Sequence, residues 1–383
     1  MTIGILGGGQ LGYMLALAGY PLGLHFRFLD PSPEAPVGRI APRVTADYTD
    51  HRALEKFAHG LTLVTYEFEN VPVESVRFLA ERVPVYPPSA ALETAQDRRS
   101  EKQLFQKLEI PTVEFAEVNS PAGLDAAVEQ IGLPAVLKTC RMGYDGKGQW
   151  ILRGLEDVAG AKAEIPGEPL LLEKFTPFTR EVSLLAVRST KGETAFYPLV
   201  ENHHRGGILR LSLAPAPRLT AALQRAAEDY ARRILEALGY AGVLAIEFFE
   251  CEGRLLANEM APRVHNSGHW TIEGAAASQF ENHVRAILGL PLGSTAAPGV
   301  SAMLNLIGEV PEPAEVLAVP DAHLHLYGKT PRPGRKLGHV TLRAASAPEL
   351  AARLAALPAF FHRPEFCLEA MPRHSAPRSA RSN

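Results

Sequence analysis

The stretch that most constrains the fold is an apolar hairpin in the second half of the chain. Alternating side chains predict strands over 243–250 and 254–260, joined by a short turn that contains a glycine. Folding the hairpin about this turn brings Glu259 opposite Glu247, or within one residue pair of it. Two carboxylates held side by side repel each other, and a bound cation relieves the repulsion. The hairpin therefore predicts a divalent-metal site.

Polar side chains extend this candidate site. Asn258 offers a third oxygen beside the carboxylates, and Arg263, His265 and Asn266 follow the hairpin closely. Oxygen ligands in this number suit a Mg²⁺ ion that carries nucleotide phosphates better than a cage built from protein alone. Solvated glutamates on a surface hairpin are the common alternative, but the apolar flanks and the polar run favour a binding site.

Length and composition bound the other possibilities. A chain of 383 residues, 46% of them hydrophobic, can bury several cores, so we expect two or three domains. A net charge of −3 indicates neither a nucleic-acid nor a membrane partner, and no apolar run approaches the roughly 20 residues of a membrane span. Three scattered cysteines and an N-terminus that enters a strand directly predict a soluble cytoplasmic protein with reduced thiols.

The first hundred residues predict a parallel α/β domain. A strand over 2–6 leads into the glycine pattern G-x-G-x-x-G at 7–12 and an apolar helix, and a second strand over 24–29 ends in Asp30. This pattern is typical of dinucleotide-binding proteins. A more general interpretation is a tight turn whose helix N-terminus presents free N–H groups to a phosphate.

Acidic residues follow the third predicted strand, over 61–66. Glu67 and Glu69 come at its carboxyl end, where open parallel sheets bind ligands. Compensation of the positive end of a helix dipole explains such residues equally well. A fourth strand over 83–86, closed by two prolines, completes the predicted domain.

The middle of the chain predicts a phosphate-binding flap. The helix over 97–108 carries Arg98 in its first turn, and the strand over 135–139 carries Lys138 in an apolar setting. The loop over 141–149 alternates glycines with polar residues, so its backbone amides can close over phosphates. It lacks the P-loop pattern, and glycines favour a plain hairpin turn equally well.

The remaining segments alternate predicted strands and helices. We predict strands over 169–175, 181–187, 196–200, 300–307 and 323–327, and helices over 221–238 and 347–356. A basic turn over 328–336 can serve a phosphate monoester, although most basic surface turns are simply solvated.

Taken in order, these motifs resemble the ATP-grasp superfamily. Lys138, GYDGKGQ at 143–149, EKF at 173–175, Glu247 and Asn258–Glu259 carry this resemblance. More closely, the chain resembles the 5-(carboxyamino)imidazole ribonucleotide synthetases of purine biosynthesis. That resemblance extends from about Thr2 to Leu342 and adds GGGQLG at 7–12, EFENVP at 67–72, APRVHNSGHWT at 261–271 and GRKLGH at 334–339.

The resemblance implies a fold of mixed α/β and α+β class. The expected parts are an N-terminal Rossmann-like parallel-sheet domain over 1–95, a two-part ATP-grasp domain over 96–297 with a lid subdomain at about 110–175, and a small β-rich C-terminal domain over 298–371. A tail over 372–383, rich in Ser, Arg and Pro, is expected to be disordered. The resemblance also implies a homodimer.

The resemblance further implies an activity and a set of contacts. The family reaction joins bicarbonate to the exocyclic amine of 5-aminoimidazole ribonucleotide, with ATP becoming ADP and phosphate. The implied ATP contacts are Arg98, Lys138, Gly143, Tyr144, Asp145, Gly146, Lys147, Gly148, Gln149, Glu173, Lys174, Phe175, Thr176, Glu181, His204, Asn258 and Glu259. Glu247 and Glu259 would bind Mg²⁺. The implied ribonucleotide contacts are Gln10, Leu11, Glu69, Asn266, Lys329, Arg335 and Lys336.

The chemistry of this reaction suits the residues present. Bicarbonate is a poor electrophile, and its phosphorylation gives carboxyphosphate, which collapses to carbon dioxide or accepts an amine. The site must then neutralise phosphate charge and exclude water. Arg263 suits bidentate capture of bicarbonate. Asp145 or His265 would take a proton from the amine, and the sequence does not choose between them.

Three other functions are compatible with parts of the sequence. A formate-dependent ligase acting on glycinamide ribonucleotide shares the ATP-grasp framework and the N-terminal ribonucleotide site. A nicotinamide-dependent oxidoreductase would use the glycine pattern and Asp30, although it has no use for paired glutamates. A non-catalytic nucleotide-binding module would not need the polar run over 263–269.

Overall fold

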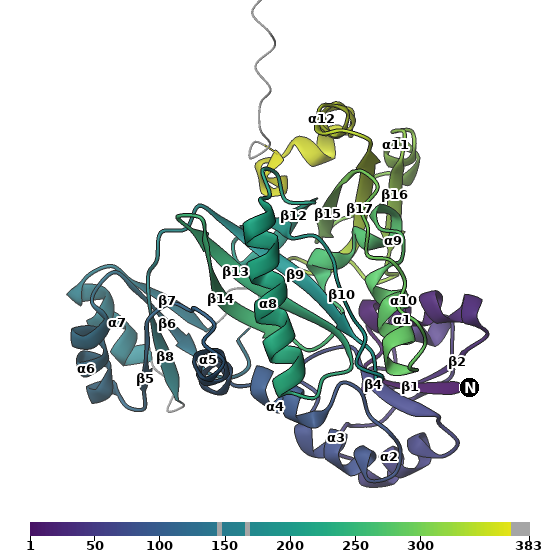
Figure 1. Cartoon of the computed structure of the whole chain (residues 1–383), viewed down its shortest axis with the longest axis horizontal. Helices are drawn as coiled ribbons and strands as arrows, with labels where there is room; N and C mark the ends of the chain where they lie inside the picture. The colour runs from purple at the N-terminus through teal and green to yellow at the C-terminus, as the bar shows by residue number, and fades with distance from the viewer. Residues whose placement is uncertain (144–147, 165–168, 369–383) are drawn as a thin grey trace, which may run out of the picture.

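The computed structural model describes residues 1–143, 148–164 and 169–368, which form three β-sheets with helices packed on them (Figure 1). Tyr144, Asp145, Gly146 and Lys147 of the predicted flap lie outside the described residues, as does the predicted tail over 372–383.

The N-terminal sheet has four parallel strands in the order β3-β2-β1-β4. Its elements are β1 (Thr2–Leu6), β2 (His25–Leu29), β3 (Arg43–Val44), β4 (Leu63–Tyr66), α1 (Gln10–Gly19), α2 (His51–Ala58), α3 (Val73–Ala80) and α4 (Ser89–Ala95). The strand predicted over 83–86 is wrong, because only a single parallel bridge joins Val64 to Val85. Pro84 and the prolines that follow Tyr86 lack the N–H groups that a longer ladder requires.

A second, antiparallel sheet lies within the range predicted for the lid. Its strands, in the order β5-β8-β6-β7, are β5 (Phe115–Val118), β6 (Ala135–Thr139), β7 (Gln149–Leu152) and β8 (Leu170–Lys174). Helices α6 (Pro121–Ile131) and α7 (Leu155–Glu164) pack on it, and apolar side chains such as Leu137 and Leu172 form a core of its own. This unit stands apart at the left of Figure 1, connected through α5 (Arg98–Lys107).

The third sheet has nine strands and runs through the rest of the molecule. Eight lie in the order β14-β13-β9-β11-β12-β15-β17-β16, and β10 pairs with β9. The strands are β9 (Arg180–Arg188), β10 (Thr194–Phe196), β11 (Val200–Arg205), β12 (Ile208–Ala214), β13 (Gly242–Cys251), β14 (Arg254–Ala261), β15 (Val300–Ile307), β16 (Ala322–Leu326) and β17 (Lys336–Ala344). Helices α8 (Ala221–Ala237), α9 (Thr271–Gly274), α10 (Gln279–Ile287), α11 (Pro313–Leu317) and α12 (Ala347–Ala355) accompany it.

Two findings about this sheet differ from the expectations. The single strand predicted over 196–200 is wrong, because the chain between β10 and β11 contains Pro198, which has no N–H group to donate. The sheet also crosses the predicted domain boundary at 297–298, since β12 pairs with β15 along residues such as Leu211 and Leu304. The division into domains over 1–95, 96–297 and 298–371 stays a prediction.

Candidate active site

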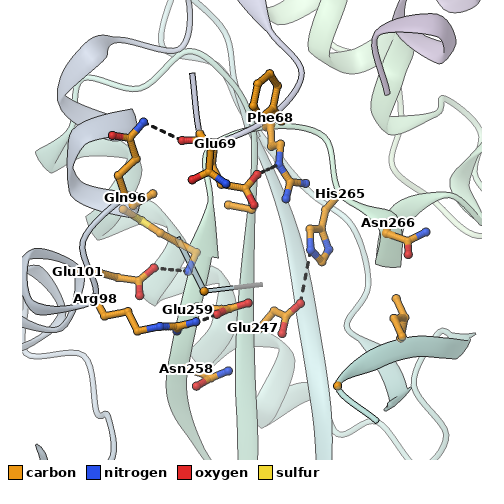
Figure 2. Close-up of a pocket in the computed structure, with 18 of the residues that line it drawn as sticks. Phe68, Glu69, Gln96, Arg98, Glu101, Glu247, Asn258, Glu259, His265 and Asn266 are labelled. Atoms are coloured by element: carbon orange, nitrogen blue, oxygen red, sulfur yellow. Dashed lines mark hydrogen bonds and ion pairs between the residues drawn. The ribbon is translucent and has the colours of Figure 1, made fainter. Parts of the chain in front are cut away.

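A cleft of about 590 Å³ opens where three parts of the molecule meet (Figure 2). These are the second sheet (β5 to β8, the lid sheet), the nine-stranded third sheet (the large sheet) and the N-terminal region. It brings together many of the residues predicted for the site. Those that line it are Gln10, Leu11, Glu69, Arg98, Lys138, Gly143, Gln149, Glu181, His204, Glu247, Asn258, Glu259, Arg263, His265, Asn266 and Lys336. They come from α1 and the loop after β4 in the N-terminal region and from strands of the other two sheets, so the cleft exists only in the folded chain.

The paired glutamates stand where the hairpin geometry predicts them. Glu247 on β13 and Glu259 on β14 are direct cross-strand partners, with a β-bulge immediately after Glu247. Burial, and then the charge of Glu259, raise the pKa of Glu247 to about 7. Arg98 Nη1 lies 3.1 Å from Glu259 Oε2, and His265 Nε2 lies 3.4 Å from Glu247 Oε1 (Figure 2). These contacts relieve only part of the repulsion between the two acids.

The donor set at the hairpin fits a magnesium ion that brings other ligands with it. Asn258 Oδ1 is buried and has no hydrogen-bond partner within the described chain. Two carboxylates and this amide oxygen are hard donors of the kind that Mg²⁺ prefers, together with phosphate oxygens. Across residues 1–143, 148–164 and 169–368, no group of three or more His, Cys, Asp or Glu side chains is placed to hold a metal ion.

The N-terminal glycine loop holds anions that belong to the protein itself. The Glu67 carboxylate accepts hydrogen bonds from the backbone N–H groups of Gly9 and Gly12, the latter at 2.7 Å, and Asp30 accepts one from Gly8 at 2.7 Å. Three N–H groups of this turn are therefore already bonded to carboxylates, and the interpretation of the turn as a phosphate site stays a prediction. A dinucleotide pyrophosphate would have to displace both carboxylates, which argues against the oxidoreductase.

Arg263 lines the cleft and is hydrogen-bonded to other groups of the protein. Its Nε donates to Glu69 Oε2, and its Nη1 donates to the carbonyl of Val264 at 3.0 Å. Burial opposes ionisation of Glu69, but Arg263 outweighs it and lowers the pKa of Glu69 to about 2. Two of the five N–H groups of the guanidinium are thus in use, and the remaining groups on Nη1 and Nη2 are the donors that could bind bicarbonate.

His265 is a neutral imidazole at neutral pH. Burial, and then the charge of Arg263, lower the pKa of His265 to about 3. Its Nδ1 lies 2.9 Å from the Ser267 hydroxyl. A nitrogen of such low basicity is a weak proton acceptor, which weakens the prediction of His265 as the base. The other candidate, Asp145, lies outside the described residues.

Glu181 and His204 form a pair on neighbouring strands of the cleft. His204 Nδ1 lies 2.5 Å from Glu181 Oε2. Burial alone would lower the pKa of His204, but Glu181 and the other acids of the cleft outweigh it and raise that pKa. Glu181 also lines the cleft, where its carboxylate oxygens can accept hydrogen bonds from a ribose.

The segment predicted to receive adenine does not line the cleft. The Glu173 carboxylate is buried against Lys138, at 2.5 Å, and Lys174 pairs with Glu114 on the surface at 2.8 Å. The backbone N–H groups of Lys174 and Phe175 donate to protein carbonyls. Thr176 and Gly148 also lie outside the cleft lining. Adenine recognition by residues 173–176 stays a prediction, with these two backbone donors already in use.

The predicted ribonucleotide contacts are only partly assembled. Lys329 does not line the cleft itself, but its ammonium group donates to Gln10, which does. Arg335 lies outside the lining and donates to the carbonyl of Thr330 at 3.1 Å. Asn266 forms two hydrogen bonds with the side chain of Asn305, at 2.7 and 3.0 Å.

Sequence reasoning missed several residues of the cleft. Those not predicted are Phe68, Asn70, Ala95, Gln96, Glu101, Cys140, Met142, Gly207, Leu209, Phe249, Met260 and Ala261. Helical spacing was a usable signal for Glu101, because it lies three residues after Arg98 and so on the same face of α5. Gln96, whose side-chain amide donates to the carbonyls of Glu69 and Val71, had no such signal.

Comparisons with known proteins agree with this geometry. Family models match in order along the chain: the ribonucleotide synthetase preATP-grasp domain at residues 1–96, the ATP-grasp domain at 103–280, and the phosphoribosylaminoimidazole carboxylase C-terminal domain at 301–353. The N5-carboxyaminoimidazole ribonucleotide synthase of Pseudomonas aeruginosa is 59% identical over 93% of this chain and 98% of its own length. The chain belongs to the N5-carboxyaminoimidazole ribonucleotide synthase family.

Solved structures of the family match along nearly the whole chain. The N5-carboxyaminoimidazole ribonucleotide synthetase of Thermus thermophilus has a TM-score of 0.90 and 62% identity, covering 92% of this chain and 97% of its own. The Aspergillus clavatus synthase, in complex with ADP and 5-aminoimidazole ribonucleotide, has a TM-score of 0.86 and 33% identity, covering 92% and 96%. These comparisons confirm the predicted ATP-grasp fold and the family resemblance.

Proposed function

We propose that this chain uses ATP and bicarbonate to carboxylate the exocyclic amine of 5-aminoimidazole ribonucleotide, forming 5-(carboxyamino)imidazole ribonucleotide, ADP and phosphate. The observation that carries the proposal is the direct pairing of Glu247 with Glu259 in a cleft that also presents Arg98 and Lys138. Family membership indicates which substrates to expect, and the cleft contains the charged side chains that phosphoryl transfer from ATP requires.

The first chemical step is transfer of the terminal phosphoryl group of ATP to a bicarbonate oxygen. ADP leaves, and the product carboxyphosphate contains a carbonyl carbon with a good leaving group. Arg98 and Lys138 neutralise the phosphate oxygens during this transfer. When bound, Mg²⁺ would be held by Glu247, Glu259 and Asn258 and would supply further positive charge to the phosphates. Arg263, through its remaining N–H groups, would orient bicarbonate.

In the second step the amine nitrogen attacks the carbonyl carbon of carboxyphosphate, inorganic phosphate leaves, and the nitrogen loses a proton. Gln10, Asn266 and Lys336 line the same cleft as the phosphate-binding residues, so the ribonucleotide can lie within reach of the intermediate. Lys329, which donates to Gln10, would receive the ribonucleotide phosphate. Because carboxyphosphate reacts readily with water, a closed cleft favours attack by the amine.

A coupled assay of ADP release tests the proposal. We expect release with ATP, bicarbonate and 5-aminoimidazole ribonucleotide together, and product formation only when bicarbonate is present. The same assay with formate and glycinamide ribonucleotide separates the alternative ligase. Turnover with that pair, and none with bicarbonate and aminoimidazole ribonucleotide, would reject the proposal.

We also propose that the chain works in the cytoplasm as a homodimer, as the family resemblance implies. No helix within the described ranges is long and apolar enough to cross a membrane. Light scattering coupled to size-exclusion chromatography measures the oligomeric state directly, and a monomeric mass at assay concentration would contradict the dimer.

A further inference from the structure

A buried group of charges lies behind the cleft and is not explained by the roles above. Lys102 on α5, Lys138 on β6 and Glu173 on β8 are exposed by 0%, 7% and 3% respectively. Glu173 Oε2 lies 2.5 Å from Lys138 Nζ, and Glu173 Oε1 lies 3.2 Å from Lys102 Nζ. Burial opposes ionisation of Glu173, but the two lysines outweigh it and lower the pKa of Glu173 to about 2.

The group contains two lysine side chains and one carboxylate. Of the three side chains, Lys138 lines the cleft, whereas Lys102 and Glu173 lie behind it. The neighbouring carboxyl of Glu101 accepts a hydrogen bond from the backbone N–H of Met260 at 2.6 Å, not from Lys102. Lys138 is the member of the group that faces the cleft, where an anionic ligand can compete with Glu173 for its amine nitrogen.

Lys102 is fixed to the hairpin that carries the paired glutamates. Its Nζ lies 3.0 Å from Thr112 Oγ1 and 3.4 Å from the carbonyl of Ala257, the residue before Asn258 on β14. The Thr112 hydroxyl donates to the same carbonyl at 2.8 Å. Contacts with the large sheet therefore hold the side chain of Lys102 in place, and from there its nitrogen contacts Glu173 on the lid sheet.

We propose that Lys102 is a positioning residue that keeps Glu173 neutralised, so that Lys138 is released to a phosphate of ATP. This inference rests on the proposed function, because it takes the nucleoside triphosphate as the anion that enters the cleft. If Lys102 were absent, moving Lys138 onto a phosphate would leave a buried carboxylate without a cation, which is unfavourable. Lys138 would then stay with Glu173.

Binding of AMP-PNP, an ATP analogue that is not hydrolysed at the γ-phosphate, tests this inference by calorimetry in saturating Mg²⁺. We expect Lys102→Met to weaken binding by about tenfold or more, close to the loss in Lys138→Met, because the phosphate contact is lost in both. In Lys102→Met/Glu173→Gln no buried carboxylate holds Lys138, so we expect the double variant to recover most of this loss. Lys107→Met, on the exposed side of α5, is the matched control.

The double variant shows whether Lys102 acts by positioning Lys138 or only stabilises the fold. If it binds AMP-PNP no better than Lys102→Met, or if Lys102→Met binds as the wild type does, the inference is wrong. Circular dichroism monitors folding. Should Lys102→Met not fold, the double variant, which lacks the buried carboxylate, decides, and its failure to fold also rejects the inference. The titration needs no turnover, so wild-type binding of AMP-PNP without ADP release would reject the proposed function alone.

Discussion

At the scale of single residues, three cations of the cleft already have carboxylate partners within the protein. Arg98 contacts Glu259, Lys138 contacts Glu173, and Arg263 contacts Glu69. Substrate binding at such a site exchanges one anion for another and does not neutralise isolated charges. Each cation stays paired in this exchange, but the carboxylate that it leaves needs another partner, because an unpaired buried charge is unfavourable.

The paired glutamates give the first prediction at this scale. We expect Glu259→Gln to lower kcat by about a hundredfold or more, since removing one metal carboxylate weakens stabilisation of the charge that develops during phosphoryl transfer. ADP release in saturating Mg²⁺ is the measurement. Glu252→Gln, at the exposed turn of the same hairpin, is the control and should behave as wild type. Near wild-type turnover of Glu259→Gln would contradict the assigned role.

The ammonium group of Lys329 gives a prediction about pH. Burial lowers the pKa of Lys329 to about 8, against the partly compensating charge of Glu67. Because the charged form is the one that binds a phosphate, kcat/KM for the ribonucleotide should fall as pH rises through about 8. Lys329→Arg keeps its charge at any pH that the fold tolerates and should remove this fall. An unchanged profile in Lys329→Arg would show that another group titrates.

At the scale of elements, the glycine pattern in the turn between β1 and α1 binds a carboxylate of the protein itself. Gly7 adopts a φ of +98°, and a Cβ at Gly9 would lie 2.5 Å from Glu67 Oε1. The glycines therefore make room for a carboxylate from the end of β4. That carboxylate compensates the N-terminus of α1, as one interpretation of Glu67 expected.

This close approach predicts the effect of one added methyl group. We expect Gly9→Ala to lower the free energy of unfolding by about 1–3 kcal/mol, because the loop must shift and weaken its bond to Glu67. Urea denaturation is the measurement. Gly160→Ala, in α7 with open space around its Cβ, is the control and should be stabilising by about 0.5–1 kcal/mol through helix propensity. Equal effects at both positions would contradict the packing argument.

The elements also show what the sequence can and cannot predict. Strands over 2–6, 135–139 and 300–307 were predicted with their observed bounds, because each is a short, largely apolar run with clear ends. The strands over 83–86 and 196–200 failed, because apolar runs that contain proline look like strands but lack the donors to pair.

The contacts of the site also divide into those that the sequence predicts and those that it does not. The contact between Glu247 and Glu259 follows from the register of a single hairpin, which is local information. The contact between Lys102 and Glu173 joins a helix to a strand far along the chain, and no spacing rule predicts it. Asn305 was missed for the same reason, since it meets Asn266 only after β12 and β15 have paired.

At the scale of the whole molecule, distant segments complete one another at the cleft. Gln10 of the N-terminal region meets Lys329 of the C-terminal region, and β15 continues the sheet of the central region. Helix α1 packs on α10, with Leu15 and Val284 in one shared core. The predicted ribonucleotide contacts therefore depend on assembly of the entire chain, whereas the predicted phosphate contacts Arg98 and Lys138 lie in the central region alone.

Because of this difference, we expect one substitution in β15 to change KM for the ribonucleotide and to leave KM for ATP unchanged. Asn305 is fully buried, exchanges two hydrogen bonds with Asn266 and donates to the carbonyl of Leu209 at 2.9 Å. We expect Asn305→Leu to raise KM for aminoimidazole ribonucleotide by about tenfold, with KM for ATP unchanged, because the amide of Asn266 loses its partner. Ser301→Ala, on the same strand, is the control. Equal rises for both substrates would indicate general damage to the fold and contradict the assignment of Asn266 to the ribonucleotide.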